Sequence, residues 1–264
     1  MAIVPDVLRA PNTLRVVEMA ARTYRRTWRG SIITAFISPL LFLGAMGYGL
    51  GTLVDSGSAA DLGVPYVEFI APALLAASTA QTGANEGSWP VMAGIKWVKT
   101  YEAALATPIG ISDLALGIQS WLAIRLFLTA FVFVIAAALT GALDLLGGLA
   151  AIPVAILTGW ALAAPIAAYT ATLQDEIRLV SIYRFGIVPM FLFSGTFFPI
   201  EQLPDWLETV ALFTPLWHGV DLCRWIVLDI PTRLPAFVEV GYLLLWAVTG
   251  VSASLITFRR RLLV

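Results

Sequence analysis

The sequence predicts an all-α polytopic membrane protein with six transmembrane helices, and three observations lead to this fold class. Of the 264 residues, 59% are apolar and only 12% are charged, whereas a soluble domain typically carries about 25% charged residues. Apolar segments long enough to cross a bilayer, which takes about 20 residues, recur along the chain. Basic residues are concentrated in every second connection between these segments. A single transmembrane domain is therefore expected over residues 1–264.

Six apolar segments are expected to span the membrane: 31–54, 66–84, 114–143, 145–172, 179–199 and 236–258. Prolines and glycines interrupt several of them, which membrane helices tolerate where neighbouring helices satisfy the freed backbone groups. In the first segment, GAMGYGLG at 44–51 places small residues where helices can approach closely, within one subunit or between two. No convincing repeat relates the two halves, which disfavours the inverted-repeat architecture of many secondary transporters.

The distribution of charge sets the expected orientation. Arginines and lysines precede the first segment, follow the second and the fourth, and end the chain with Arg259, Arg260 and Arg261. The other three connections are mainly acidic. Because basic residues are retained on the cytoplasmic side, both termini are predicted to be cytoplasmic.

Two cytoplasmic segments are predicted to carry structure of their own. Residues 13–29 place Leu14, Val17, Ala21, Tyr24 and Trp28 on one helical face and arginines on much of the rest, which indicates an amphipathic helix at the membrane interface; a stretch that only anchors the topology is the alternative. The connection at 90–108 is longer than chain reversal requires. A short helix there would offer a docking surface to a cytoplasmic partner, and a plain solvated loop is the alternative.

The segment at 200–230, between the fifth and sixth spans, is expected to form short re-entrant or interfacial helices on the outer side. Its prolines and acids interrupt the apolar pattern, and the helices predicted at 205–214 and 217–228 are too short to span. Such a segment suits a lid over the outer end of a transport path, or a surface cap with no gating role. The residues predicted to form this outer gate are Phe198, Pro199, Pro204, Trp206 and Leu207.

Ionisable residues inside the spans are few. Arg125 is expected to snorkel to the interface and Glu86 to cap a turn. No chain of Asp, Glu and His suited to proton relay is present, and no nucleophile–base pair or paired carboxylate occurs at depth. No catalytic residues are therefore predicted.

The sequence also argues against cofactor chemistry in this chain. With one cysteine (Cys223) and one histidine (His218), no metal site is expected. The only lysines, Lys96 and Lys99, lie in no glycine-rich phosphate-binding loop. Any use of ATP must come from another polypeptide.

Four segments carry a resemblance to a known family: ISPLLFLGAMGYGLG (37–51), YVEFIAPALLAAS (66–78), KTYEAALATPIGISDLALG (99–117) and FSGTFFPIEQLPDWLETVALFTPLWHGVDLCR (193–224). They resemble the membrane subunit of an ABC transporter type 2 permease, most like the lipo-oligosaccharide and drug exporter branch that includes the nodulation-protein J and daunorubicin-resistance membrane subunits. The resemblance covers nearly the whole chain, and the last segment is its most specific part.

The resemblance implies an export permease of the bacterial plasma membrane that moves an amphiphilic drug, lipid or lipo-oligosaccharide. Its implied partners are a second permease subunit, identical or related, and a pair of ABC ATPase subunits that bind ATP and Mg. Residues 13–29 would be the connecting helix and 90–108 the coupling-helix loop. A nucleic-acid partner is not expected. The residues implied in coupling to the ATPase are Lys99, Thr100, Tyr101, Glu102, Ala103, Leu105 and Thr107.

The alternative from a different class is a secondary transporter or a membrane-embedded enzyme without an ATPase partner. Transport driven by a proton gradient in the absence of any ATPase would favour this alternative. An ATPase that co-purifies with the chain would favour the export permease.

Overall fold

A computed structural model describes residues 12–51 and 63–262. The described residues are helical almost throughout, and no strand occurs among them. The α-helices are α1 (Asn12–Phe42), α3 (Tyr66–Met92), α4 (Thr100–Leu105), α5 (Ile111–Leu139), α6 (Leu145–Thr170), α7 (Ile177–Ile182), α8 (Val188–Phe193), α9 (Asp205–Leu212), α10 (Pro215–Leu228) and α11 (Ala236–Leu262). Three π-helical segments, η2 (Leu43–Leu50), η3 (Ala93–Trp97) and η4 (Tyr183–Ile187), and a short 3-10 helix, η5 (Ile200–Gln202), continue or connect them.

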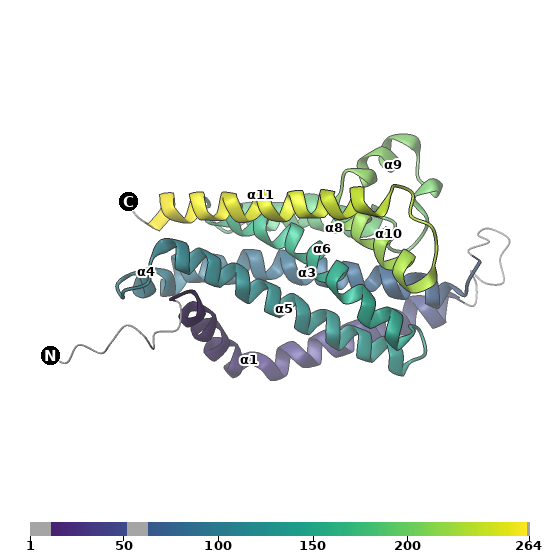
Figure 1. Cartoon of the computed structure of the whole chain (residues 1–264), viewed down its shortest axis with the longest axis horizontal. Coiled ribbons are helices and arrows are strands. Elements are labelled where there is room, and N and C mark those ends of the chain that lie inside the picture. The colour runs from purple at the N-terminus through teal and green to yellow at the C-terminus, as the bar shows by residue number, and fades with distance from the viewer. Residues whose placement is uncertain (1–11, 52–62, 263–264) are drawn as a thin grey trace.

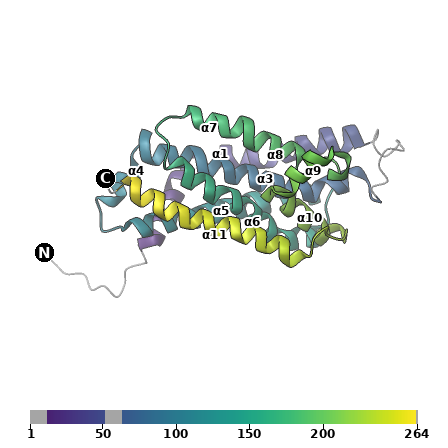
Figure 2. The ribbon, with the colours of Figure 1, turned by 90° about the horizontal axis from the view of Figure 1, so that it is seen from above.

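The long helices form a bundle along one axis, with α6 at its centre (Figure 1). Helix α6 packs against α3, α5, α10 and α11, and α1 packs against α5. The short helix α4 and the C-terminal end of α11 lie at one end of the bundle, and α9 and α10 lie at the other (Figure 1). These are called the α4 end and the α9 end below. Helices α7 and α8 follow one another along one edge of the bundle (Figure 2).

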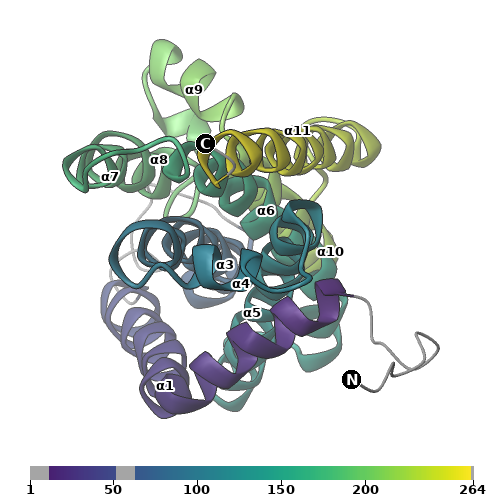
Figure 3. The ribbon, with the colours of Figure 1, turned by 90° about the vertical axis from the view of Figure 1, so that its left-hand side faces the viewer.

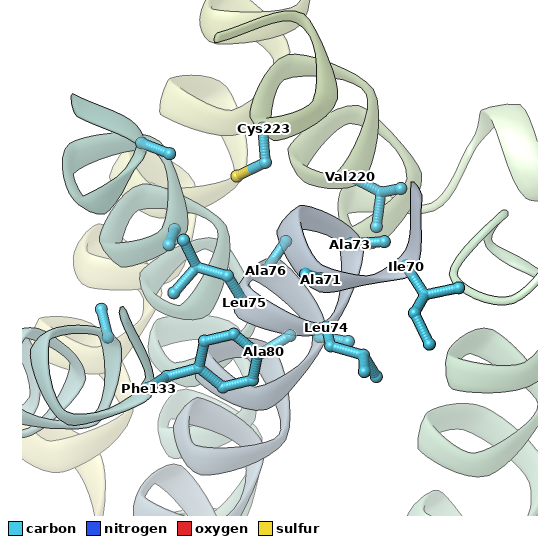
Figure 4. Packing of buried hydrophobic residues seen from close by; sticks show 14 of the residues in the cluster. Ile70, Ala71, Ala73, Leu74, Leu75, Ala76, Ala80, Phe133, Val220 and Cys223 are labelled. Carbon is cyan, nitrogen blue, oxygen red and sulfur yellow. The ribbon is translucent and has the colours of Figure 1, made fainter. Parts of the chain in front are cut away.

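The main core cluster lies around α3. Ile70 and Leu75 of α3 are fully buried, as is Phe133 of α5. Val220 and Cys223 bring α10 into the same cluster, as Figure 4 shows. Alanines fill much of the remaining α3 surface, so neighbouring backbones approach closely, which is the usual basis of helix packing in membranes.

Among residues 12–51 and 63–262, three helices are long and apolar enough to cross a membrane: α5, α6 and α11. They correspond to the predicted spans 114–143, 145–172 and 236–258. Helix α3 contains the predicted span 66–84 but continues to Met92, and its C-terminal part is more polar. The count of six spans remains a prediction.

The remaining two predicted spans differ from the helices observed. The predicted interfacial helix 13–29 and the first span form one continuous helix, α1, which η2 extends to Leu50; residues 52–54 of that span lie outside the described residues. The N-terminal part of α1 runs sideways across the end of the bundle (Figure 3). The predicted span 179–199 is helical only to Phe193. The helix ends there because Gly195 takes a positive φ of 74°, which glycine accommodates without a Cβ clash.

Candidate functional site: the two ends of the bundle

At the α4 end, the chain leaves α3 through η3 and turns into α4 at Lys99. Lys99 has a φ of 58°, the left-handed region, and it immediately precedes the first residue of α4. A single left-handed residue reverses the chain sharply. After this turn, α4 packs against η3 and α5.

Tyr101 fixes α4 to the bundle. Its side chain is buried, and its ring lies over Gly94 of η3, where even a Cβ atom would clash with the ring. The ring centroid lies 6.0 Å from that of Phe258 in α11. Burial raises the pKa of the Tyr101 phenol well above its usual value, and the charge of Glu86 raises it further. Tyr101 is therefore a neutral anchor that joins α4, η3 and α11.

The predicted coupling residues divide between two faces of α4. Tyr101 faces the interior, and Leu105 is half-buried against the cluster that contains Tyr101. The other five are exposed: Lys99, Thr100, Glu102, Ala103 and Thr107. Lys99 and Glu102 form an exposed ion pair at 3.6 Å. The helix is thus held by one face, and its other face is exposed.

The N-terminal part of α1 is docked beside α4. Val16 is fully buried and packs on Gly117 of α5. The Asn12 side-chain amide donates to the Pro108 carbonyl at 3.0 Å, just beyond α4. Val16 and Tyr101 also share one buried cluster, so the N-terminal part of α1 and the predicted coupling segment are in contact.

A buried ion pair lies close to this end of the bundle. Arg125 Nε donates to Glu86 Oε1 at 2.8 Å, and both side chains are 12% exposed. The guanidinium also lies over the Tyr24 ring, 4.1 Å from its centroid. The expectation that Arg125 snorkels and Glu86 caps a turn was wrong: the two residues pair across α3 and α5, because a shared ion pair satisfies both charges inside the protein.

At the α9 end, Arg224 of α10 holds the turn that follows α8. Arg224 is buried, and its Nε donates to the Phe69 carbonyl at 3.2 Å. Its Nη2 donates to the carbonyls of Gly195 at 2.7 Å and Thr196 at 3.3 Å. The guanidinium lies 3.7 Å from the centroid of the Phe69 ring. A permanently charged side chain is thus buried by binding backbone carbonyls of two other segments.

Aromatic residues complete the attachment of this turn. The Tyr66 hydroxyl donates to the Phe197 carbonyl at 3.0 Å. The Phe197 ring stacks on Phe42 of α1 and meets Phe191 of α8 edge to face, with centroid distances of 5.7 and 5.3 Å. The turn therefore joins α1, α3, α8 and α10.

Helix α9, in contrast, rests on the surface. Trp206 is 68% exposed. Arg233, in the connection to α11, pairs with Glu208 at 2.5 Å and with Glu201 at 3.6 Å. Of the predicted gate residues, Pro204 and Trp206 are exposed and Phe198, Pro199 and Leu207 are half-buried. The predicted gate residues are thus divided between the turn held by Arg224 and the exposed helix α9, which is paired with Arg233 through Glu208.

Comparison with known proteins identifies the family of this bundle. The sequence profile described as ABC-2 type transporter matches residues 15–228. The chain belongs to the ABC-2 type transporter family. Nodulation protein J of Rhizobium leguminosarum bv. trifolii is 31% identical over 240 residues, 91% of this chain and 90% of that protein. Nodulation protein J of Rhizobium meliloti is 30% identical over 240 residues, with the same coverage, and that of Sinorhizobium fredii is 30% identical over 233 residues, 88% of this chain and 87% of that protein.

For this ABC-2 permease, sequence reasoning did not find the residues that attach the two ends. Arg224 fell in the predicted helix 217–228 but was assigned no role, although its place between Cys223 and Trp225 was a signal of burial. Tyr101 was selected for coupling, but its inward direction depends on Gly94, which no local pattern relates to it.

Proposed function

We propose that this ABC-2 permease is the membrane subunit of an ATP-driven exporter of an amphiphilic substrate. A drug, a lipid or a lipo-oligosaccharide fits this class. The chain crosses the plasma membrane six times with both termini in the cytoplasm, so the α4 end is cytoplasmic and the α9 end is outer. It works with a second permease subunit and with separate ATPase subunits that bind ATP and Mg. Similarity to Nodulation protein J and to the ABC-2 family supports this reading.

The observation that carries the coupling part of the proposal is the two-faced attachment of α4. The exposed face, with Glu102 and Ala103, contacts the ATPase, and the buried Tyr101 passes its displacement to α11 through Phe258. A helix of six residues has little stability of its own, so it moves as a unit with the residues that anchor it. The N-terminal part of α1 moves with it because the two segments are in contact.

A substitution on the exposed face tests this coupling. Ala103→Arg adds bulk and charge where α4 is exposed, so the folded permease should be retained while binding of the ATPase is lost. The measurement is co-purification of an ABC ATPase subunit co-expressed with the permease, together with substrate-stimulated ATP hydrolysis in proteoliposomes. Gln174→Arg, at an exposed side chain of the α6–α7 connection, is the matched control.

Two results would count against this proposal. Normal ATPase binding by Ala103→Arg would show that α4 is not the docking element. Export driven by a proton gradient without any ATPase would show that the protein is not an ATP-driven exporter.

At the outer end, α9 is the proposed gate, and the turn held by Arg224 is its fixed base. Trp206→Ala removes the largest exposed ring of α9 and should change the rate of export without changing thermal stability. Val210→Ala, at a 52% exposed position of the same helix, is the control. Equal rates of export by Trp206→Ala and the wild-type permease would mean that α9 is a surface cap with no gating role.

A further inference from the structure

A groove runs between α6 and α11, and its lining residues are distinct from those of both candidate sites. Its volume is about 350 Å³, within the range of roughly 300–1,000 Å³ for small-molecule sites. Neither α4 nor α9 contributes to it. The lining residues include Pro165, Tyr169, Thr172, Trp246, Ala253 and Thr257. The two helices are joined beneath it, where Ser254 Oγ donates to the Ala164 carbonyl at 3.1 Å.

The groove has the length and chemistry of one acyl chain. Along α11 it extends from Trp246 to Thr257, which corresponds to about 16 Å at the rise of an α-helix. Half of a hydrocarbon core of about 30 Å is roughly 15 Å. Carbon atoms of proline, alanine and the aromatic rings supply most of its wall. An acyl chain that spans one leaflet of the bilayer therefore matches the length of the groove.

The stripe of α11 that lines the groove continues into two arginines. The spacing Trp246, Gly250, Ala253, Thr257 leads by a further three and four residues to Arg260 and Arg261. Arg260 is exposed and Arg261 is half-exposed. No acidic residue occurs at 240–262, so the charged side chains at this end of α11 are all positive.

We propose that this groove binds an anionic phospholipid of the leaflet next to the C-terminal end of α11. The acyl chain lies between α6 and α11, and the headgroup phosphate binds Arg260 and Arg261. Arginine is suited to this role because its guanidinium donates two parallel hydrogen bonds to phosphate. The excess of positive charge favours an anionic headgroup over a zwitterionic one, whose ammonium group the arginines repel. Binding of the lipid at this site is separate from the proposed transport function, because it requires neither ATP nor the exported substrate.

The position of the groove also links the lipid to coupling. Phe258, on which Tyr101 packs, immediately follows Thr257 and precedes the arginines. A lipid held here would fix the end of α11 that anchors α4. This consequence rests on the proposed exporter function, whereas lipid binding itself does not.

The test is binding of defined lipids to the delipidated full-length permease in detergent. Phosphatidylglycerol and phosphatidylcholine are added separately, and bound lipid is counted by native mass spectrometry alongside the thermal unfolding midpoint. Phosphatidylglycerol should be retained and should raise the midpoint more than phosphatidylcholine. Arg261→Gln and Arg260→Gln should each weaken phosphatidylglycerol binding roughly tenfold, as expected for the loss of a charge-assisted hydrogen bond.

Matched controls separate this site from general attraction of lipid to a basic tail. Arg259→Gln removes the same charge from the opposite face of α11 and should change affinity by less than about twofold. Ala253→Phe fills the groove and should abolish retention of phosphatidylglycerol, whereas Ser252→Phe adds the same ring at an exposed position outside it.

Three outcomes would overturn the proposal. Equal losses for Arg259→Gln and Arg261→Gln would mean a non-specific charge effect. Retention of phosphatidylglycerol by folded Ala253→Phe would place the lipid elsewhere. The third outcome is a wild-type permease that binds no lipid but has the mass of a dimer, together with an Ala253→Phe variant that has the mass of a monomer. This result would mean that the groove is a contact between two copies of the chain.

Discussion

The two ends of the bundle attach their short helices by opposite chemistry. At the α4 end, a neutral aromatic ring, Tyr101, fits against Gly94 and Phe258. At the α9 end, a charged side chain, Arg224, binds the carbonyls of Gly195 and Thr196. The aromatic contact tolerates small displacements, since van der Waals contact has no directional requirement. The arginine contact depends on direction, because hydrogen bonds weaken steeply when misaligned.

The difference suggests distinct mechanical roles for the two ends. An element that passes on the motion of a partner benefits from an anchor that slides without breaking, which suits the role proposed for α4. A base beneath a moving lid benefits from a rigid anchor, which suits the role proposed for the turn before α9. The following predictions test this contrast, from the largest expected effect to the smallest.

Loss of the Arg224 guanidinium should have the largest effect. Arg224→Met removes a hydrogen-bond donor from the carbonyls of Phe69, Gly195 and Thr196, and each buried acceptor left unpaired costs about 1–3 kcal/mol. The measurement is the free energy of unfolding in detergent, or the yield of monodisperse permease if the variant does not fold. Arg224→Lys keeps the charge but lacks the planar fork, so it should fall between Arg224→Met and wild type. A stability for Arg224→Met within about 1 kcal/mol of wild type would contradict the rigid anchor.

Loss of the Tyr101 ring should cost slightly less. Tyr101→Ala removes a buried aromatic side chain, for which losses of about 3 kcal/mol are typical when the site partly collapses. Tyr101→Phe keeps the ring and should remain close to wild type in unfolding free energy. In coupled ATPase assays, Tyr101→Ala should retain ATP hydrolysis but lose export, since α4 still binds the partner but no longer moves α11. Parallel loss of both activities in a folded variant would argue against transmission through the ring.

The same residue gives a pH test with a defined sign. Because burial raises the pKa of the Tyr101 phenol, the folded state binds this proton more tightly than the unfolded state. Its contribution to stability is therefore complete below about pH 10, the pKa of an unfolded tyrosine, and is lost as the pH rises towards the folded pKa. Above pH 10, the thermal unfolding midpoint of the wild type should fall more than that of Tyr101→Phe. Parallel curves would mean that the phenol reaches solvent.

The sequence alone predicted an all-helical fold, and the comparison with known proteins confirmed the predicted resemblance to ABC-2 permeases. The long apolar runs of α5, α6 and α11 were predicted to within a few residues because hydrophobic length is a local property. The end of α8 at Phe193 was missed, since the positive φ of Gly195 is stabilised by Arg224, 29 residues later in the chain. Local pattern placed the helices, whereas their attachments arise from contacts between distant segments.

The same distinction between local pattern and distant contacts explains which residues of the candidate site could be predicted. Exposure of Lys99, Glu102 and Ala103 follows from helical spacing once α4 is assumed, so the sequence could find them. The pairing of Arg125 with Glu86 could not be found, because it depends on the relative rotation of α3 and α5. A charge in an apolar run could be recognised from the sequence, but its partner could not.

The ion pairs of α9 should be weaker than either anchor. Arg233→Gln removes the pairs with Glu208 and Glu201 but leaves the backbone hydrogen bond from residue 233 to Asp221. Partly exposed pairs contribute about 0.5–1 kcal/mol and weaken with salt. Hydrogen exchange should therefore increase in α9 but not in α10, and added salt should reduce the difference between variant and wild type. Faster exchange in both helices would mean that α9 and the base beneath it open together.

The smallest effect is expected at Lys99, and it separates charge from backbone shape at the α4 end. Lys99→Gln removes the exposed pair with Glu102, so the unfolding free energy should change by less than about 0.5 kcal/mol. Lys99→Gly also removes the pair but relieves the left-handed φ of 58°, which costs a residue with a Cβ roughly 1 kcal/mol. Lys99→Gly should therefore be more stable than Lys99→Gln by a similar amount in denaturant unfolding. Because the turn that directs α4 depends on this conformation, the opposite order would mean that the ion pair, and not the backbone, sets the direction of the helix.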